Sequence, residues 1–130
     1  MKNIVILGGG ISGLSSAYYL LKSTNAKVTI IEKSKSIGGW IKSHQYDNNI
    51  VLERGPRTIR AYGFAAKSTL NLKCIPQYHV GHSDILNNIR EIIENNNLPI
   101  RLVGASYDGI SVNDCIHSAK IMCDKISTSF

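Results

Sequence analysis

Long apolar runs, cysteine pairs and blocks of like charge are all missing from this sequence. No stretch approaches the roughly 18 consecutive apolar residues that crossing a bilayer requires. Residues 1–3 lead directly into a short apolar run, so we expect no cleavable targeting segment. The three cysteines form no C-x-x-C pair, which argues against a disulfide framework and a zinc site, and we expect no metal. The net charge of +6 is scattered along the chain, so nucleic acid is not an expected partner.

The composition is that of one small globular domain. The chain has 130 residues, of which 43% are hydrophobic and 18% are charged. These fractions are ordinary for a folded protein and argue against wholesale disorder. A chain of this length can form one modest core, so we expect a single domain over residues 1–130.

Two apolar runs flank a helical pattern near the N-terminus. Residues 4–7 and 28–31 are short and rich in β-branched side chains, and residues 12–22 carry apolar side chains at helical spacing. This order predicts a parallel βαβ unit with a right-handed crossover. A third buried run, residues 100–103, predicts another strand.

The remaining pattern predicts a β-hairpin and further helices, which together give an α/β fold with a small parallel sheet. Residues 40–45 and 49–53 are strand-like and joined by a turn. Residues 64–72 form a short helical pattern, and Ser83 is a candidate N-cap for a longer helix. We expect the apolar stripe of that longer helix to be core: Ile85, Ile89, Ile92 and Ile93. A last helix carries its own apolar face: Val112, Cys115, Ile116, Ala119, Met122 and Ile126.

A G-x-G-x-x-G motif joins the first apolar run to the first helix. Gly8 allows a tight turn, Gly10 lets a pyrophosphate approach the backbone, and Gly13 lets the helix lie close to the strand. The helix N-terminus offers unpaired N–H groups and partial positive charge to the phosphates. The alternative interpretation is a glycine turn without a ligand. The candidate phosphate-binding residues are Gly8, Gly9, Gly10, Ile11, Ser12 and Gly13.

An acidic residue follows at the spacing that a dinucleotide site requires. Glu32 ends the second apolar run, 19 positions after Gly13. A carboxylate there can accept hydrogen bonds from both ribose hydroxyls, and it would repel a 2′-phosphate. The motif and Glu32 together predict a site for FAD or NAD.

A second glycine pair favours FAD over NAD. Gly38 and Gly39 lie six residues after Glu32 and resemble the extended fingerprint of flavin amine oxidase-like proteins, in which such a pair approaches the dinucleotide again. Ser36 stands where those proteins usually carry an arginine.

Longer stretches resemble the protoporphyrinogen oxidase family. The runs at residues 38–43 and 52–60 look like the N-terminal part of that family, and the runs at residues 74–78 and 104–116 look like its C-terminal part. The resemblance implies an internally deleted form, in which the substrate and membrane-binding domains between the two parts are absent.

This resemblance implies a reduced Rossmann-like FAD-binding domain built from two segments. Residues 1–72 would be the N-terminal FAD segment and residues 73–130 the C-terminal FAD segment. The run at residues 100–103 would then lie beside the run at residues 4–7, which would be the central strand. We therefore also expect an uncovered sheet face.

The resemblance also implies roles for individual residues and a reaction. Glu32 and Lys33 would contact the adenosine ribose. FAD would oxidise protoporphyrinogen IX to protoporphyrin IX and be reoxidised by molecular oxygen, at the mitochondrial inner membrane as a peripheral protein. No catalytic side chain is implied, and an inactive FAD-binding or interaction module is the alternative. The residues implied to lie near the flavin are Trp40, Gly55, Pro56, Arg57, Thr58, Ala105, Ile110, Ser111 and Val112.

Overall fold

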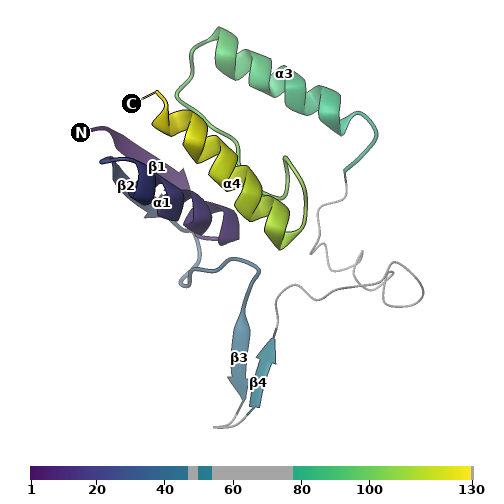
Figure 1. The fold of residues 1–130 in the computed structure, drawn as a ribbon. Coiled ribbons are helices and arrows are strands. Elements are labelled where there is room, and N and C mark those ends of the chain that lie inside the picture. Colours follow the sequence, from purple (N-terminus) through teal and green to yellow (C-terminus); the bar gives the residue numbers. More distant parts are fainter. Residues whose placement is uncertain (47–49, 54–77, 130) are drawn as a thin grey trace.

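The computed structural model describes residues 1–46, 50–53 and 78–129. Figure 1 shows a small layered body with a hairpin and one helix projecting from it. The predicted helix at residues 64–72 lies outside the described residues. The elements in chain order are β1 (Asn3–Leu7), α1 (Ile11–Ser23), β2 (Lys27–Ile31), β3 (Ser43–Tyr46), β4 (Ile50–Glu53), α3 (His82–Asn95) and α4 (Val112–Ser127).

The N-terminal βαβ unit is confirmed. β1 and β2 pair in parallel, with Ile4 opposite Val28. Their side chains alternate in exposure along both strands, because successive residues of a strand point to opposite faces. Helix α1 covers the face that carries Ile6, whose side chain lies beneath Gly13. No helix of the described residues covers the opposite face, where Leu7 is 80% exposed, in keeping with the expected uncovered face.

The core lies between α1 and α4, which come from opposite ends of the chain (Figure 1). Leu20 of α1 and Ala119 and Cys123 of α4 are almost completely buried. The Cys123 thiol donates a hydrogen bond to the carbonyl of Ser16 at 3.4 Å, and burial raises its pKa. Cys115 is buried too, and both thiols are free. Of the predicted apolar face of the last helix, Cys115 and Ala119 are confirmed as core, and its other four residues are half-buried.

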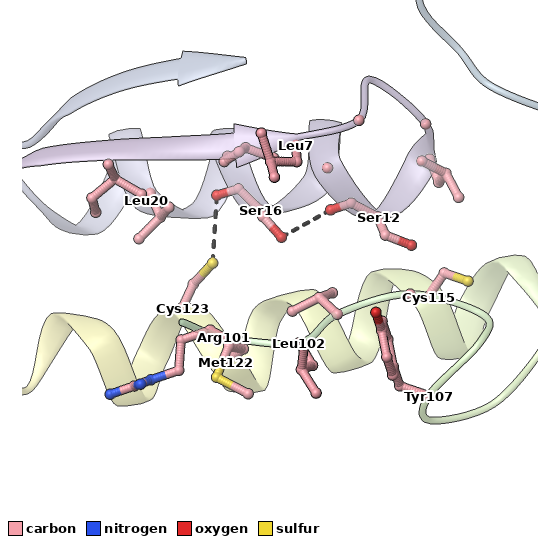
Figure 2. Close-up of a pocket in the computed structure, with 18 of the residues that line it drawn as sticks. Leu7, Ser12, Ser16, Leu20, Arg101, Leu102, Tyr107, Cys115, Met122 and Cys123 are labelled. Atoms are coloured by element: carbon pink, nitrogen blue, oxygen red, sulfur yellow. Dashed lines mark hydrogen bonds between the residues drawn. The ribbon is translucent and has the colours of Figure 1, made fainter. Parts of the chain in front are cut away.

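The prediction of a third strand at residues 100–103 is wrong. These residues form no regular strand, and among the described residues β1 pairs only with β2. Pro99 has no N–H to donate, and the N–H of Ile100 bonds back to the carbonyl of Leu98 at 2.8 Å. Segment 99–105 instead lines a cavity together with β1, and Figure 2 shows Leu102 across that cavity from Leu7.

The hairpin is confirmed, although its first strand begins later than predicted. β3 and β4 pair in antiparallel register, with Ser43 opposite Glu53 and Tyr46 opposite Ile50. Trp40, predicted as the first strand residue, lies in a turn that follows Gly38. The hairpin projects away from the body and packs against no other element in the described part of the chain (Figure 1).

Helix α3 exists, but its predicted cap and its predicted burial are wrong. Gly81, in the left-handed conformation (φ 86°), is the N-cap, and Ser83 lies inside the first turn. Leu86 is buried, whereas Ile85 and Ile92 are 61% and 57% exposed. Within the described residues no other helix or strand covers this stripe, because α3 stands apart from the body.

Candidate dinucleotide site

The loop between β1 and α1 has the geometry of a phosphate-binding turn. Gly8 has a positive φ of 104°, and a side chain at Gly13 would overlap the carbonyl oxygen of Gly8. The N-cap of α1 is Gly10, and no side chain caps the helix. No acidic residue lies in the first turn. The first N–H groups of α1 and the positive end of its dipole are thus open to an anion.

Glu32 is an ionised carboxylate that closes the back of this loop. Its Oε2 accepts from the N–H of Gly9 at 2.6 Å, and its Oε1 accepts from the N–H and hydroxyl of Ser34, each at 2.7 Å. These hydrogen bonds, that of Gly9 foremost, lower the pKa of Glu32 from 4.5 to about 2. A carboxylate has about four acceptor positions, so capacity for a ribose hydroxyl remains.

The second glycine pair packs directly against the first glycine motif. The N–H of Gly38 donates to the carbonyl of Gly9 at 2.7 Å, and Gly38 bridges Gly10 in parallel fashion. Gly39 adopts a φ of 61°, and a Cβ there would lie 3.0 Å from the Cα of Gly10. Only glycine allows two backbones to approach so closely, so the pair forms one wall of the loop.

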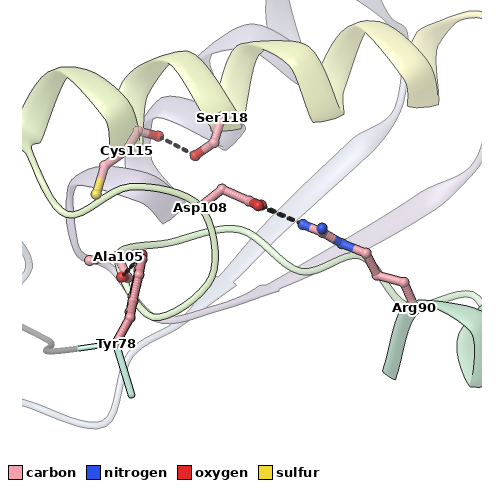
Figure 3. Close-up of polar contacts among 6 residues, drawn as sticks. All are labelled: Tyr78, Arg90, Ala105, Asp108, Cys115 and Ser118. Atoms are coloured by element: carbon pink, nitrogen blue, oxygen red, sulfur yellow. Dashed lines mark hydrogen bonds and ion pairs between the residues drawn. The ribbon is translucent and has the colours of Figure 1, made fainter. Parts of the chain in front are cut away.

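The C-terminal glycine turn reaches the same loop from the other end of the sequence. A Cβ on Gly104 would lie 3.7 Å from the Ser12 hydroxyl. Tyr78 anchors this turn by donating its hydroxyl to the carbonyl of Ala105 at 2.7 Å (Figure 3). Burial raises the pKa of Tyr78, so its hydroxyl stays a donor at neutral pH.

An ion pair and a helix cap fix the rest of the C-terminal loop. Arg90 of α3 reaches both carboxylate oxygens of Asp108, at 2.7 and 2.6 Å (Figure 3). Ser111 caps α4, since its hydroxyl accepts from the N–H of Asp114 while its own N–H donates to the Asp114 carboxylate, both at 3.0 Å. The backbone donor of Ser111 is therefore used by the cap in this structure.

One cavity of about 1010 Å³ joins these parts. Figure 2 shows Ser12 and Leu7 on one side of it and Leu102 and Tyr107 on the other. Most residues predicted to hold the cofactor line it: Gly8, Gly10, Ile11, Ser12, Gly13, Trp40, Ala105, Ile110 and Val112.

Other predicted residues lie elsewhere. Gly9 and Glu32 stand behind the phosphate loop, and Lys33 is exposed. Four further candidates fall outside the described residues: Gly55, Pro56, Arg57 and Thr58. Sequence reasoning missed Ser34 and Tyr78. The signal for Ser34 was available, because a serine two residues after a carboxylate can close a local turn on it.

Comparison with known proteins agrees with this geometry. Residues 6–71 match the family model described as the NAD(P)-binding Rossmann-like domain, which is half of the chain, so the chain belongs to that family. The predicted α/β Rossmann-like fold is confirmed by this match. None of the described helices is both long and apolar enough to cross a bilayer.

Within that family, the chain is similar to porphyrinogen-oxidising proteins. It is 43% identical to human protoporphyrinogen oxidase over 72 residues, covering 55% of this chain and 15% of that protein. It is 39% identical over 77 residues to protoporphyrinogen oxidase of Dictyostelium discoideum, covering 48% and 14%. It is 42% identical over 60 residues to coproporphyrinogen III oxidase of Bacillus subtilis, covering 42% and 13%. The chain is thus protoporphyrinogen oxidase-like and spans about 15% of these relatives' length.

Proposed function

We propose that this chain is the FAD-binding part of a protoporphyrinogen oxidase-like flavoprotein of haem biosynthesis. The observation that carries the proposal is the convergence of three glycine-containing turns from both chain ends. Gly10 packs against the turn at Gly39, and Ser12 lies beside the turn at Gly104, where an added Cβ would be 3.7 Å from its hydroxyl. Its relatives are named for the oxidation of porphyrinogens.

Each part of the site matches one part of a dinucleotide. The open N–H groups of α1 are suited to the pyrophosphate, and Glu32 to the adenosine ribose. Trp40, Ala105 and Val112 line the cavity near the phosphate loop, at the place we assign to the flavin. When bound, FAD supplies the two-electron redox chemistry, while the chain orients it and shields it from water.

Two features favour FAD over NAD in this proposal. The Gly38–Gly39 pair narrows the mouth of the phosphate loop, and the C-terminal turn at Gly104 adds a wall from a distant segment. Both occur where the sequence resembles flavin amine oxidase-like proteins. Val112, the first residue of α4, lines the same cavity, and the positive end of the helix dipole there would favour negative charge on a reduced flavin.

The proposed reaction is dehydrogenation of protoporphyrinogen IX to protoporphyrin IX. Electrons would pass to FAD and then to molecular oxygen, which is reduced to hydrogen peroxide. The proposed location is the mitochondrial inner membrane, as a peripheral protein. No described side chain is assigned an acid–base role.

A second candidate is an FAD-binding module that does not turn over substrate. The observation that favours it is coverage, since the chain spans about 15% of the relatives that carry the named activity. Both candidate functions include the flavin site, and only the first includes oxidation of a porphyrinogen.

A flavin titration of the full chain separates these possibilities. We expect FAD fluorescence to be quenched at one equivalent, with NAD⁺ unable to compete. Glu32→Gln should weaken FAD binding about tenfold or more, since hydrogen bonds to a charged group contribute roughly 1.5–3 kcal/mol. Glu94→Gln on the projecting α3 makes the same charge change and should have no effect. Saturable NAD⁺ binding without FAD binding would contradict the proposal, and added protoporphyrinogen IX distinguishes enzyme from module.

A further inference from the structure

The cavity continues well beyond the glycine turns, and this remote half is apolar. The glycine end is bounded by the loop at Gly8 and the turn at Gly104, whereas the other end runs beneath β1 toward residue 2. The remote half is floored by side chains of the two core helices: Ser16, Leu20, Met122, Cys123 and Ile126. The proposed dinucleotide site uses the glycine loops and assigns no ligand to this remote half.

One wall of the remote half is a strand edge whose hydrogen-bonding groups have no strand opposite them. The carbonyl of Lys2 accepts from the N–H of Lys27, and the N–H of Gly8 donates to the carbonyl of Ile31. Even-numbered residues of β1 therefore face β2. Because backbone groups alternate along a strand, the N–H and C=O of Val5 and Leu7 face the cavity. In the described part of the chain, no strand pairs with that edge.

The opposite wall is segment 99–103, which also lacks a strand partner within the described residues. Its apolar side chains Ile100, Leu102 and Val103 line the cavity. Figure 2 shows Leu7 on β1 and Leu102 on this segment on opposite sides of the cavity. The backbones of β1 and segment 99–103 thus form the two walls of a trough, and α1 and α4 form its floor. The trough has room for one extended strand between the two walls.

Charge makes the trough asymmetric. Among the described residues lining the cavity, Lys2 and Arg101 are the only charged ones. Lys2 precedes β1, at the end opposite the loop at Gly8, and its Nζ donates to the carbonyl of Ser129 at 2.9 Å. Figure 2 shows Arg101 away from the glycine loop as well. An occupant with a carboxylate at that end would be attracted to both.

We propose that this trough, defined by β1 and segment 99–103, binds one extended strand of another polypeptide. The strand would carry apolar side chains toward α1 and α4 and an acidic residue at the Lys2–Arg101 end. It would hydrogen-bond to Val5 and Leu7, as in recognition by strand addition. An acyl chain would fill the volume but leave those backbone groups unpaired. A second copy of this chain is a poorer occupant, because it would have to insert one of its strands between β1 and segment 99–103 while that strand stayed paired in its own sheet.

The probe is a labelled peptide that copies residues 26–32 of this chain, AKVTIIE, which is rich in β-branched residues and ends in a glutamate. Placed antiparallel to β1, its glutamate reaches Lys2 and Arg101. The full chain is titrated with it, and amide hydrogen exchange is followed by NMR. We expect saturable binding and at least tenfold slower exchange at Val5 and Leu7. Ile4 and Ile6, which face β2, are internal controls and should change little.

Two variants and a control peptide make the test specific. Leu102→Trp fills the trough and should weaken peptide binding at least tenfold, whereas Leu21→Trp, on an exposed position of α1 outside the cavity, should not. A peptide with proline at alternate positions should not bind, because it lacks the donors.

Three results would overturn the proposal. Unchanged exchange at Val5 and Leu7 at saturating peptide would show that β1 receives no strand. Equal weakening by both tryptophan variants would show that binding lies elsewhere. Protection at Val5 and Leu7 that rises with protein concentration alone would assign the trough to a second copy. FAD titration in the same samples reports on the flavin site separately, so failure of one proposal is not failure of the other.

Discussion

The body of the molecule and its projecting parts bury their apolar side chains very differently. In the body, α1 and α4 enclose Leu20, Ala119 and Cys123 almost completely. In the projecting parts, Val51 of the hairpin is 60% exposed, and no other described helix or strand covers the stripe on α3.

This contrast separates the apolar surface that the chain covers with its own helices from the apolar surface that it leaves exposed. The two chain ends meet in the body, where Lys2 Nζ donates to the carbonyl of Ser129 at 2.9 Å and the Ser23 and Ser127 hydroxyls lie 2.7 Å apart. The hairpin and α3 present apolar faces that no other described helix or strand covers, and the 72 residues aligned with human protoporphyrinogen oxidase make up 15% of that protein. The nucleotide loop belongs to the completed part.

The largest effect should come from the glycine beneath the phosphate loop. Gly13→Val places a side chain on the carbonyl of Gly8 and should cost about 3 kcal/mol or more, because backbone cannot yield as a side chain can. Gly81→Ala at the cap of α3 meets open space and costs only its positive φ, about 1 kcal/mol. Urea unfolding measures both. Equal losses of unfolding free energy in the two variants would contradict the distinction between the body and the projecting parts.

The next effect tests the core directly. Leu20→Ala should lower the free energy of unfolding by about 2–5 kcal/mol, since it opens a cavity between α1 and α4. Ile92→Ala on the exposed stripe of α3 should change it by about 0.5 kcal/mol at most. A large loss for Ile92→Ala would mean that α3 is covered in solution.

A smaller effect is expected at the N-terminus of α4. Ser111→Ala removes the capping hydroxyl and should cost about 1 kcal/mol. Ser83→Ala is the matched change on α3, where Gly81 is the cap, and should be neutral. Thermal melts of the two variants compare them. If Ser83→Ala lost as much stability as Ser111→Ala, Ser83 would be the N-cap of α3, as predicted from the sequence.

The smallest effect is the pH dependence contributed by Glu32. Its pKa is lowered to about 2 in the fold from 4.5. The stabilisation is therefore fully present above pH 4.5 and is lost as pH falls toward 2. The stability of the protein minus that of Glu32→Gln, followed from pH 6 to 2, should shrink over this interval. A difference independent of pH would show that the carboxylate charge does not hold the loop.

Local patterns predicted most helices and strands well, but they predicted poorly which elements pair or pack together. The βαβ unit, the glycine motif and Glu32 follow from spacing within 32 residues, where neighbours in sequence are neighbours in space. Residues 100–103 looked like a strand, but a strand needs a partner, and residue hydropathy does not supply one. The stripe on α3 looked like core because helical spacing reports amphipathicity and says nothing of what covers it. That the turn at Gly104 lies beside Ser12 could be expected only from the family resemblance.

The measurement that bears most directly on the central claim is a map of amide NMR shifts on adding FAD to the full chain. The account predicts that amides of the phosphate loop at Gly8–Gly13 and of the C-terminal turn at Gly104–Val112 shift together, at one stoichiometry and one affinity, while those of α3 do not move. Shifts confined to the N-terminal loop, with the C-terminal turn unaffected, would contradict a site shared by the two ends of the chain.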